Sequence, residues 1–279
     1  MKHILLLILC CYCIRVSAQS TDTWTAFWNS DTTLFGFKDK QGTIAISPKF
    51  NNFSTATYFD DIIAVVEGEG DSAKPYYLTK TGKIVGADSL YLFDNTPDCE
   101  NEGFIRFYDR KTDQTGLLDR SGTVVIPAVY SELSSVTNGL LYGLLNAEKK
   151  CDDPDCEHYY RHGGTCVLLD TTNTILVDNF NDSTDINFYS LLKSSNPSPD
   201  PNRVSFKAKD GSYYSFVDYQ KEFRTWLLSD ICQNPTPAKL SAISHPVLQC
   251  ETKDGWIAID RKSFIRKHFK TISTEFKKL

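Results

Sequence analysis

The sequence predicts an all-β fold, an array of about six hairpin or three-stranded repeat units. Short runs of β-branched and aromatic residues recur along the chain, and an Asp-x-x-Gly tetrapeptide or a variant of it separates paired runs. Aromatic residues make up 13% of the 279 positions, which is incompatible with intrinsic disorder. The 15 glycines and 11 prolines follow no period, which excludes a collagen-like chain.

The first 18 residues have the features of a cleaved secretory signal peptide. Lys2 precedes an apolar run from Ile4 to Ile14, and the segment Val16–Ala18 ends in a small residue before Gln19. This run is too short to span a hydrocarbon core, which needs about twenty residues. We therefore expect a signal peptide at 1–18, a lead-in at 19–30 and a repeat domain at 31–279.

These features predict a secreted, periplasmic or cell-envelope protein. Lipidation at Cys10 is the alternative, because that cysteine follows an aliphatic run. It is less favoured, since Leu9 is larger than the residue that a lipidation motif places before the cysteine. No other apolar run has membrane length, so no transmembrane span is expected.

A repeat of about forty to fifty residues organises the rest of the chain. Residues 35–50 form one copy and residues 115–130 a clear second example, with a degenerate copy at 76–85 between them. Three further copies are expected at 166–177, 214–219 and 256–265. The anchor position, occupied by Asp in most copies, falls at residues 39, 79, 119, 170, 218 and 260, at intervals of 40, 40, 51, 48 and 42.

Each copy has the chemistry of a β-hairpin turn. The Asp side chain can accept hydrogen bonds from backbone N–H groups two residues on, and Gly supplies a positive φ. At the fourth copy Asn173 takes the Gly position, and Asn also tolerates the left-handed region. The predicted turn residues are Asp39, Gly42, Gly82, Asp119, Gly122, Asp170 and Asp260.

A further strand is expected upstream of most hairpins, which gives each unit about three strands. Pro48 and Pro127 are expected to end the third strand, where no ladder donor is needed. The units could close as a β-propeller or run as an open array, with closure slightly favoured. An ordinary β-sandwich is the alternative to any repeat, but the two equal opening intervals favour repetition.

These residues resemble the WG-repeat family, whose units carry Trp-Gly, an aromatic residue, Asp-x-x-Gly, an aliphatic strand, Pro and a second aromatic residue. Phe35-Gly36 and Thr115-Gly116 stand at the Trp-Gly positions, and Trp256 stands at the matching aromatic position of the sixth copy. The fourth and fifth copies are degenerate. The resemblance implies a β-repeat interaction scaffold and carries no catalytic residues.

Six cysteines remain after the predicted cleavage, an even number that predicts up to three disulfides in an exported chain. Their pairing stays open; they are Cys99, Cys151, Cys156, Cys166, Cys232 and Cys250. The segment 151–166 also suggests a metal site, since zinc accepts thiolate and imidazole ligands. Those candidate ligands are Cys151, Cys156, His158, His162 and Cys166. A disulfide is the favoured interpretation, and no cofactor or metal is expected.

The preferred function is a non-enzymatic scaffold that binds a protein or glycan partner through exposed aromatic residues. No nucleophile elbow or zinc-protease motif occurs, so no catalytic residue is assigned. The alternative is a secreted hydrolase or metal-binding factor that uses the Cys151–Cys166 segment. A net charge of -5 argues against nucleic acid. The basic stretch 261–278 is interpreted as a solvated face, with an anionic cell-surface polymer as the alternative. The sequence does not indicate an oligomeric state.

Overall fold

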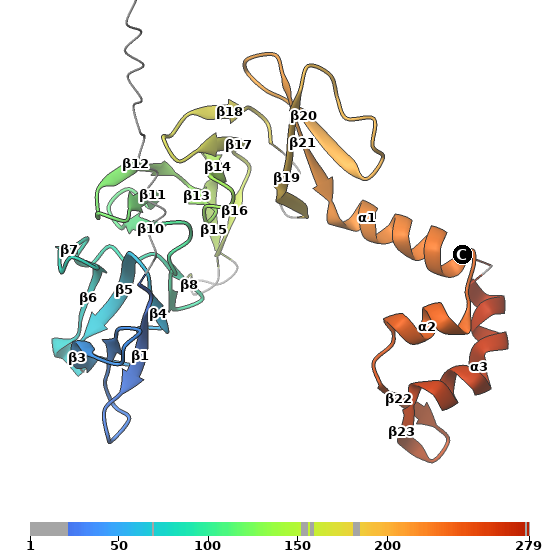
Figure 1. Ribbon diagram of the computed structural model, residues 1–279. Coiled ribbons are helices and arrows are strands. Elements are labelled where there is room, and N and C mark those ends of the chain that lie inside the picture. Colours follow the sequence, from blue (N-terminus) through green and yellow to red (C-terminus); the bar gives the residue numbers. More distant parts are fainter. Residues whose placement is uncertain are drawn as a thin grey trace, which may run out of the picture. The chain divides into compact units, whose positions relative to one another are not determined.

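The computed structural model describes residues 22–68, 70–151, 156, 159–180, 185–276 and 278 (Figure 1). The chain divides into two compact units, one comprising residues up to 105 together with 119–122, and the other comprising 106–118 and 123–279. The predicted signal peptide at 1–18 and the lipidation alternative at Cys10 lie outside the described residues.

The first unit is built on a seven-stranded antiparallel sheet in the order β4-β1-β2-β3-β5-β6-β7. Its strands are β1 (Trp24–Trp28), β2 (Phe35–Lys38), β3 (Ile44–Phe50), β4 (Tyr58–Phe59), β5 (Ile62–Glu67), β6 (Lys74–Thr79) and β7 (Ile84–Val85). A short 3₁₀ turn (Gly70–Ser72) links β5 to β6, and a small hairpin follows, β8 (Leu92–Phe93) and β9 (Thr96–Pro97). The hairpins β2–β3 and β6–β7 are the first two predicted copies.

Strand β1 lies in the segment predicted as a lead-in, 19–30. It pairs with both β2 and β4. Trp24 packs edge-on against the ring of Phe59, with centroids 5.4 Å apart. Trp24 thereby joins the partly buried residues that pack against the buried cluster of this unit.

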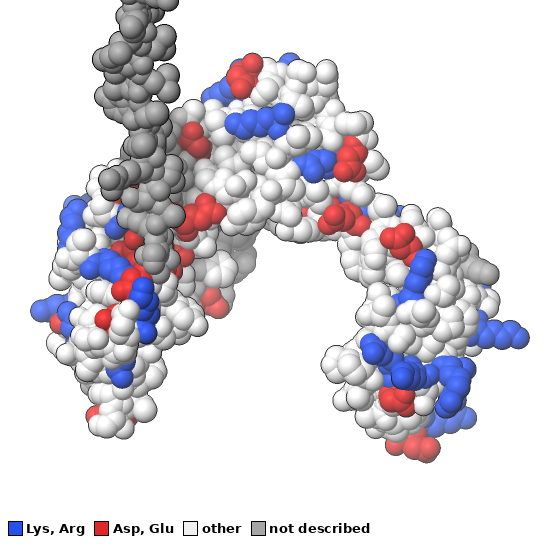
Figure 2. Space-filling model, in the orientation of Figure 1, with Lys and Arg blue, Asp and Glu red and all other residues white. Residues whose placement is uncertain are grey.

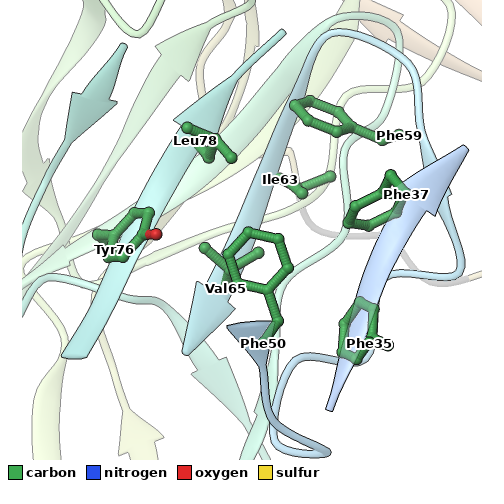
Figure 3. Packing of buried hydrophobic residues seen from close by; sticks show 8 residues of the cluster. All are labelled: Phe35, Phe37, Phe50, Phe59, Ile63, Val65, Tyr76 and Leu78. Carbon is green, nitrogen blue, oxygen red and sulfur yellow. The ribbon is translucent and has the colours of Figure 1, made fainter. Parts of the chain in front are cut away.

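Eight buried side chains form one hydrophobic cluster in the core of the first unit (Figure 3). They come from β2 through β6 and point toward one another: Phe35, Phe37, Phe50, Phe59, Ile63, Val65, Tyr76 and Leu78. Four of them are phenylalanines in mutual ring contact at centroid distances of 5.4 to 6.1 Å. The aromatic content of the sequence thus supplies the hydrophobic burial that stabilises this unit.

The glycine of the Phe35-Gly36 pair lies opposite a bulge in the neighbouring strand. Phe35 pairs with Phe50 and Phe37 pairs with Ile46, so three residues of β3 oppose Gly36 alone. A Cβ on Gly36 would collide with the backbone around Ile46 and Pro48. The same register recurs at Gly116. The prediction that Pro48 and Pro127 end their strands is wrong, because the bulge removes the need for a ladder donor and pairing resumes beyond it.

Five hairpin turns share one backbone geometry. The fourth residue donates its N–H to the carbonyl of the first over 2.8 to 3.1 Å and has a φ between 66° and 86°. The first residues are Asp39, Thr79, Asp119, Asp170 and Ala208, and the fourth are Gly42, Gly82, Gly122, Asn173 and Gly211. The side chain of Asp39 accepts from the N–H groups of Gln41 and Thr43. Asp170 makes the equivalent pair of bonds.

Asn173 also contributes a side-chain hydrogen bond, which Gly could not make. Its Oδ1 accepts from the hydroxyl of the buried Tyr130 at 2.7 Å. We expect Asn173→Gly to keep the turn yet lower the free energy of unfolding by about 1–3 kcal/mol, since the hydroxyl loses its acceptor. Asn173→Ala should cost about 1–2 kcal/mol more, because Ala resists the left-handed region. Urea unfolding measures both. In a Tyr130→Phe background the cost of Asn173→Gly should shrink, and an unchanged cost there would contradict the assignment.

The second unit contains several small antiparallel sheets. The first sheet is β10 (Phe104–Asp109), β11 (Gln114–Asp119) and β12 (Val124–Tyr130), where β10 starts at the boundary between the units. The next, in the order β13-β14-β17-β18, contains β13 (Glu132–Leu133), β14 (Leu140–Leu145), β17 (Thr165–Asp170) and β18 (Ile175–Val177). The third, in the order β19-β21-β20, contains β19 (Ile186–Ser194), β20 (Arg203–Lys207) and β21 (Tyr213–Asp218).

A second core joins these last two sheets. Its buried residues come from β14, β17, β18, β19 and β21 and from the connecting segments: Leu140, Leu168, Val177, Phe180, Ile186, Ala208, Tyr214 and Phe216. The rings of Phe180 and Phe206 pack at a tilt, with centroids 4.5 Å apart. Ala208 is the first residue of the fifth turn and is buried here, which explains why that position carries no Asp side chain.

The fifth and sixth turns are misplaced in the prediction. They lie at Ala208 and Thr252, not at 218 and 260, and both read Lys-Asp-Gly after the first residue. Asp218 and Asp260 instead begin helices, because each side chain accepts from the N–H three residues on, at Lys221 and Ser263. The third residue after each of these Asp residues is neither Gly nor Asn. The backbone therefore keeps a right-handed, negative φ at that residue and continues as a helix.

The C-terminal part is therefore largely helical. Helix α1 (Tyr219–Thr225) continues into a π-helical segment (Trp226–Cys232), and α2 (Pro237–Ile243) follows. A hairpin of β22 (Val247–Thr252) and β23 (Gly255–Asp260) precedes α3 (Arg261–Phe276). The strand predicted after Asp260 is thus replaced by a helix of 16 residues.

The prediction of an all-β repeat array is confirmed, with the helical C-terminal part as its exception. Neither a closed barrel nor a propeller is found among the described residues, where the strand order of every sheet is open. The preference for closure is therefore not supported. None of the helices in the described ranges has the length and apolar character that crossing a membrane requires.

Candidate functional site

A two-stranded hairpin interrupts the fourth repeat unit. Strands β14 and β17 pair directly up to Leu145 and Thr165, so the chain between them leaves the sheet. It forms β15 (Glu148–Cys151) and β16 (Tyr159–His162), which pair with each other and with no other strand of the described chain. This insertion accounts for the longest of the predicted intervals.

A disulfide between Cys151 and Cys156 closes the end of this hairpin, with Cα atoms 4.9 Å apart. The predicted disulfide chemistry is confirmed for this pair. Cys232 is buried and Cys250 half-buried, and neither is disulfide-bonded. Cys166 lies on β17 and packs against the second core, and Cys99 lies on an exposed loop of the first unit.

The two faces of the hairpin differ in their surroundings. Lys149 pairs with Arg161, and Cys151 with Tyr159, so alternation places these four side chains on one face. The other face carries Glu148, Lys150, Tyr160 and His162, all exposed to solvent. We call these four residues the outer face of the hairpin.

The inner face is fixed to the turn between β10 and β11 by a nearly buried arginine. The Arg161 guanidinium is only 6% exposed and donates to the Asp113 carboxylate at 2.8 Å and to the Asp113 carbonyl at 3.2 Å. The Tyr108 hydroxyl donates to the other oxygen of that carboxylate. Lys149 lies 4.1 Å from the centroid of the Tyr159 ring. Arg161 and Tyr108, from separate strands, thus meet at Asp113, and the Lys149 Nζ of a third strand lies 4.0 Å from its carboxylate.

These contacts decide the protonation of the cluster. Burial disfavours the charged carboxylate of Asp113, but the hydrogen bonds from Arg161 and Tyr108 outweigh burial and hold its pKa below the usual range. Burial and the bond to Asp113 raise the pKa of Tyr108 to about 12. At neutral pH the cluster therefore holds one carboxylate, one guanidinium and one neutral phenol.

We expect the hairpin to detach in acid. Folding lowers the pKa of Asp113, so its ionised carboxylate stabilises the folded state. This stabilisation is complete above the pKa of the unfolded chain, about 3.9, and is lost as the pH falls through the folded pKa. Arg161→Met should raise the pKa of Asp113, since only the Tyr108 hydrogen bond and the charge of Lys149 then oppose burial, and should speed amide exchange in β15 and β16. Carboxyl NMR titration measures the first effect. Lys150→Met on the outer face is the control, and an unchanged Asp113 pKa in Arg161→Met would contradict the assignment.

The structure describes four of the five candidate metal ligands and does not bring those four together. Cys151 and Cys156 are bonded to each other, and Cys166 packs against the second core. His162 lies on the opposite face of the hairpin from Cys151, and His158 lies outside the described residues. Within the described ranges no group of three or more His, Cys, Asp or Glu side chains could hold a metal ion.

Exposed apolar residues recur at one position that the sequence analysis did not single out. Ile44, Ile84 and Val124 each stand two residues after a turn glycine and are 54%, 56% and 51% exposed. Each begins the third strand of its unit, where the side chain points away from the core. The turn spacing identifies this position once the anchors are known, so the pattern could have been found from sequence.

The fold is that of an all-β protein built from hairpin repeats, and a hairpin closed by a disulfide is inserted into the fourth repeat unit. Two segments of the chain, residues 35–69 and 116–143, match a family model described as WG containing repeat. The chain thus carries WG-containing repeats, with degenerate copies elsewhere, and the resemblance inferred from the sequence is confirmed in these segments. No curated protein matches the chain significantly.

Proposed function

We propose that this protein is a non-enzymatic, exported scaffold that binds a protein or glycan partner in the cell envelope or outside the cell. One observation carries the proposal: the outer face of the inserted hairpin exposes Tyr160 by 47% on a support fixed by a disulfide and by the Arg161–Asp113 pair. A rigid support lowers the entropy that binding must overcome.

The composition of the outer face suits such a partner. A tyrosine offers a large contact area with little conformational entropy and a hydroxyl that can bond polar groups. Lys150 lies directly opposite Tyr160, and His162 follows two residues later on the same face. Aromatic rings beside hydrogen-bond donors suit both sugar rings and polar protein surfaces. The disulfide is compatible with an oxidising compartment, and it supports export together with the predicted signal peptide at 1–18.

Partner capture from the native envelope tests the proposal. The mature chain serves as bait, and quantitative mass spectrometry compares wild type with Tyr160→Ser. We expect at least about a tenfold loss of the specific partner, the size typical of a central aromatic contact. Tyr58→Ser is the matched control, since Tyr58 is 64% exposed on β4 of the first unit. Equal capture by all three proteins would contradict the proposed surface.

A further inference from the structure

A pocket lies between α2 and α3 in the C-terminal part. It has a volume of about 400 Å³ and is lined by Pro237 and Ser241 of α2 and by Lys262, Ile265, Arg266 and Phe269 of α3. This volume falls in the range of small-molecule sites, about 300–1,000 Å³. None of its lining residues belongs to the inserted hairpin.

Two sets of contacts hold the walls of the pocket in place. Arg261 donates to the carbonyls of Ser241 and Ser244, at 2.7 and 3.0 Å, and so ties the start of α3 to the end of α2. Behind this clamp Ile231, Leu240 and Ile265 are buried together. Phe269 packs half-buried against the same cluster. The apolar wall therefore belongs to a packed core and is not a loose surface patch.

The rim of the pocket is basic. Lys262 and Arg266 stand four residues apart on α3 and so share one face of the helix, and both are exposed. Five basic residues lie in 261–276 against the single acid Glu275. Figure 2 shows Lys and Arg side chains gathered over this C-terminal part. The acid next to the helix, Asp260, is engaged in capping it through the N–H of Ser263.

We propose that this pocket binds a free fatty carboxylate of medium chain length. The aliphatic chain lies against Ile265, Phe269 and Pro237, and the carboxylate pairs with Lys262 and Arg266 at the rim. An apolar wall alone would accept any hydrophobe, and two cations alone would accept any anion. Their combination in one pocket selects a molecule that has both parts.

Calorimetric titration of the full chain with decanoate, below the concentration at which it forms micelles, tests this inference. We expect saturable binding of one decanoate. Hexanoate should bind more than tenfold more weakly, because each buried methylene contributes about fourfold in affinity. Decan-1-ol should also bind several-fold more weakly, since it lacks the charge. Equal binding of decanol and decanoate would overturn the proposal.

Variants separate the pocket from general attraction to a basic surface. The double variant Lys262→Gln, Arg266→Gln removes the charges of the rim at exposed positions and should weaken decanoate binding about tenfold. Lys267→Gln, on the same helix but outside the lining, is the control and should leave binding unchanged. Ser241→Leu should fill the pocket and abolish binding, with circular dichroism checking its fold. Binding to anionic phosphatidylglycerol vesicles without binding to free decanoate would assign the surface to membranes and overturn the proposal.

Discussion

Phe37→Ala is expected to lower the free energy of unfolding of the first unit by about 3–5 kcal/mol, the cost of truncating a buried phenylalanine. Phe37 is 0% exposed, and its ring contacts those of Phe35, Phe50 and Phe59 at centroid distances of 5.4 to 6.1 Å. These rings are held by three strands and cannot collapse into the space that is left. A small domain has only about 5–15 kcal/mol of stability, so the unit should become marginal.

Native-state hydrogen exchange measures this loss in the first unit separately from the second. Phe53→Ala is the matched control, because Phe53 is 66% exposed and should change stability by less than about 0.5 kcal/mol. Equal effects of the two substitutions would mean that the rings do not pack as described.

Gly36→Ala is the second substitution with a large expected effect, a loss of about 3 kcal/mol in the first unit. The added methyl would meet the carbonyl of Ile46 and the backbone nitrogen of Pro48, and neither atom can rotate away. The cost therefore falls on the bulge, which must open and release the pairing of Phe35 with Phe50.

Gly42→Ala separates this collision from ordinary glycine strain. Gly42 has a φ of +83° and nothing within 4 Å of an added Cβ, so only the strain of about 1–2 kcal/mol applies. Urea unfolding, followed through the fluorescence of Trp24 and Trp28, should rank Gly36→Ala as the more damaging. The opposite order would show that the close approach of β2 and β3 is not what selects glycine at position 36.

The first four turns were predictable because their information is local. An acceptor side chain at the first position and Gly or Asn at the fourth specify the backbone without help from the rest of the chain, as at Asp39 and Asp170. The last two were misplaced for an equally local reason. An Asp that ends a strand can cap a turn or a helix, and the third following residue decides, as Lys221 and Ser263 show.

The candidate site was less predictable, because its contacts join distant parts of the chain. Arg161 and Asp113 are 48 positions apart, and nothing in the sequence near either residue indicates the other. The two faces of the hairpin depend on the register of β15 against β16, which separates Cys151 from His162. The metal site was predicted because these residues are close in the sequence. Closeness in the sequence does not show which side chains share a face of the hairpin.

The bulge opposite Gly36 shows an intermediate case. The Phe-Gly and Ile-x-Pro segments were visible in the sequence, but their contact follows from pairing with an unequal number of residues on the two strands. Because the sequence analysis assumed regular pairing, it predicted that β3 ends at Pro48. The strand in fact continues to Phe50, whose ring belongs to the core.

The most direct test of the binding scaffold is a hydrogen-exchange footprint of the protein with and without its captured partner. The inserted hairpin should become the main site of new protection, with slower exchange in residues 148–151 and 159–162. The core strands β5 and β17 should not change. Protection confined to other segments, with exchange in β15 and β16 unaltered, would contradict the proposal that this hairpin is the recognition surface.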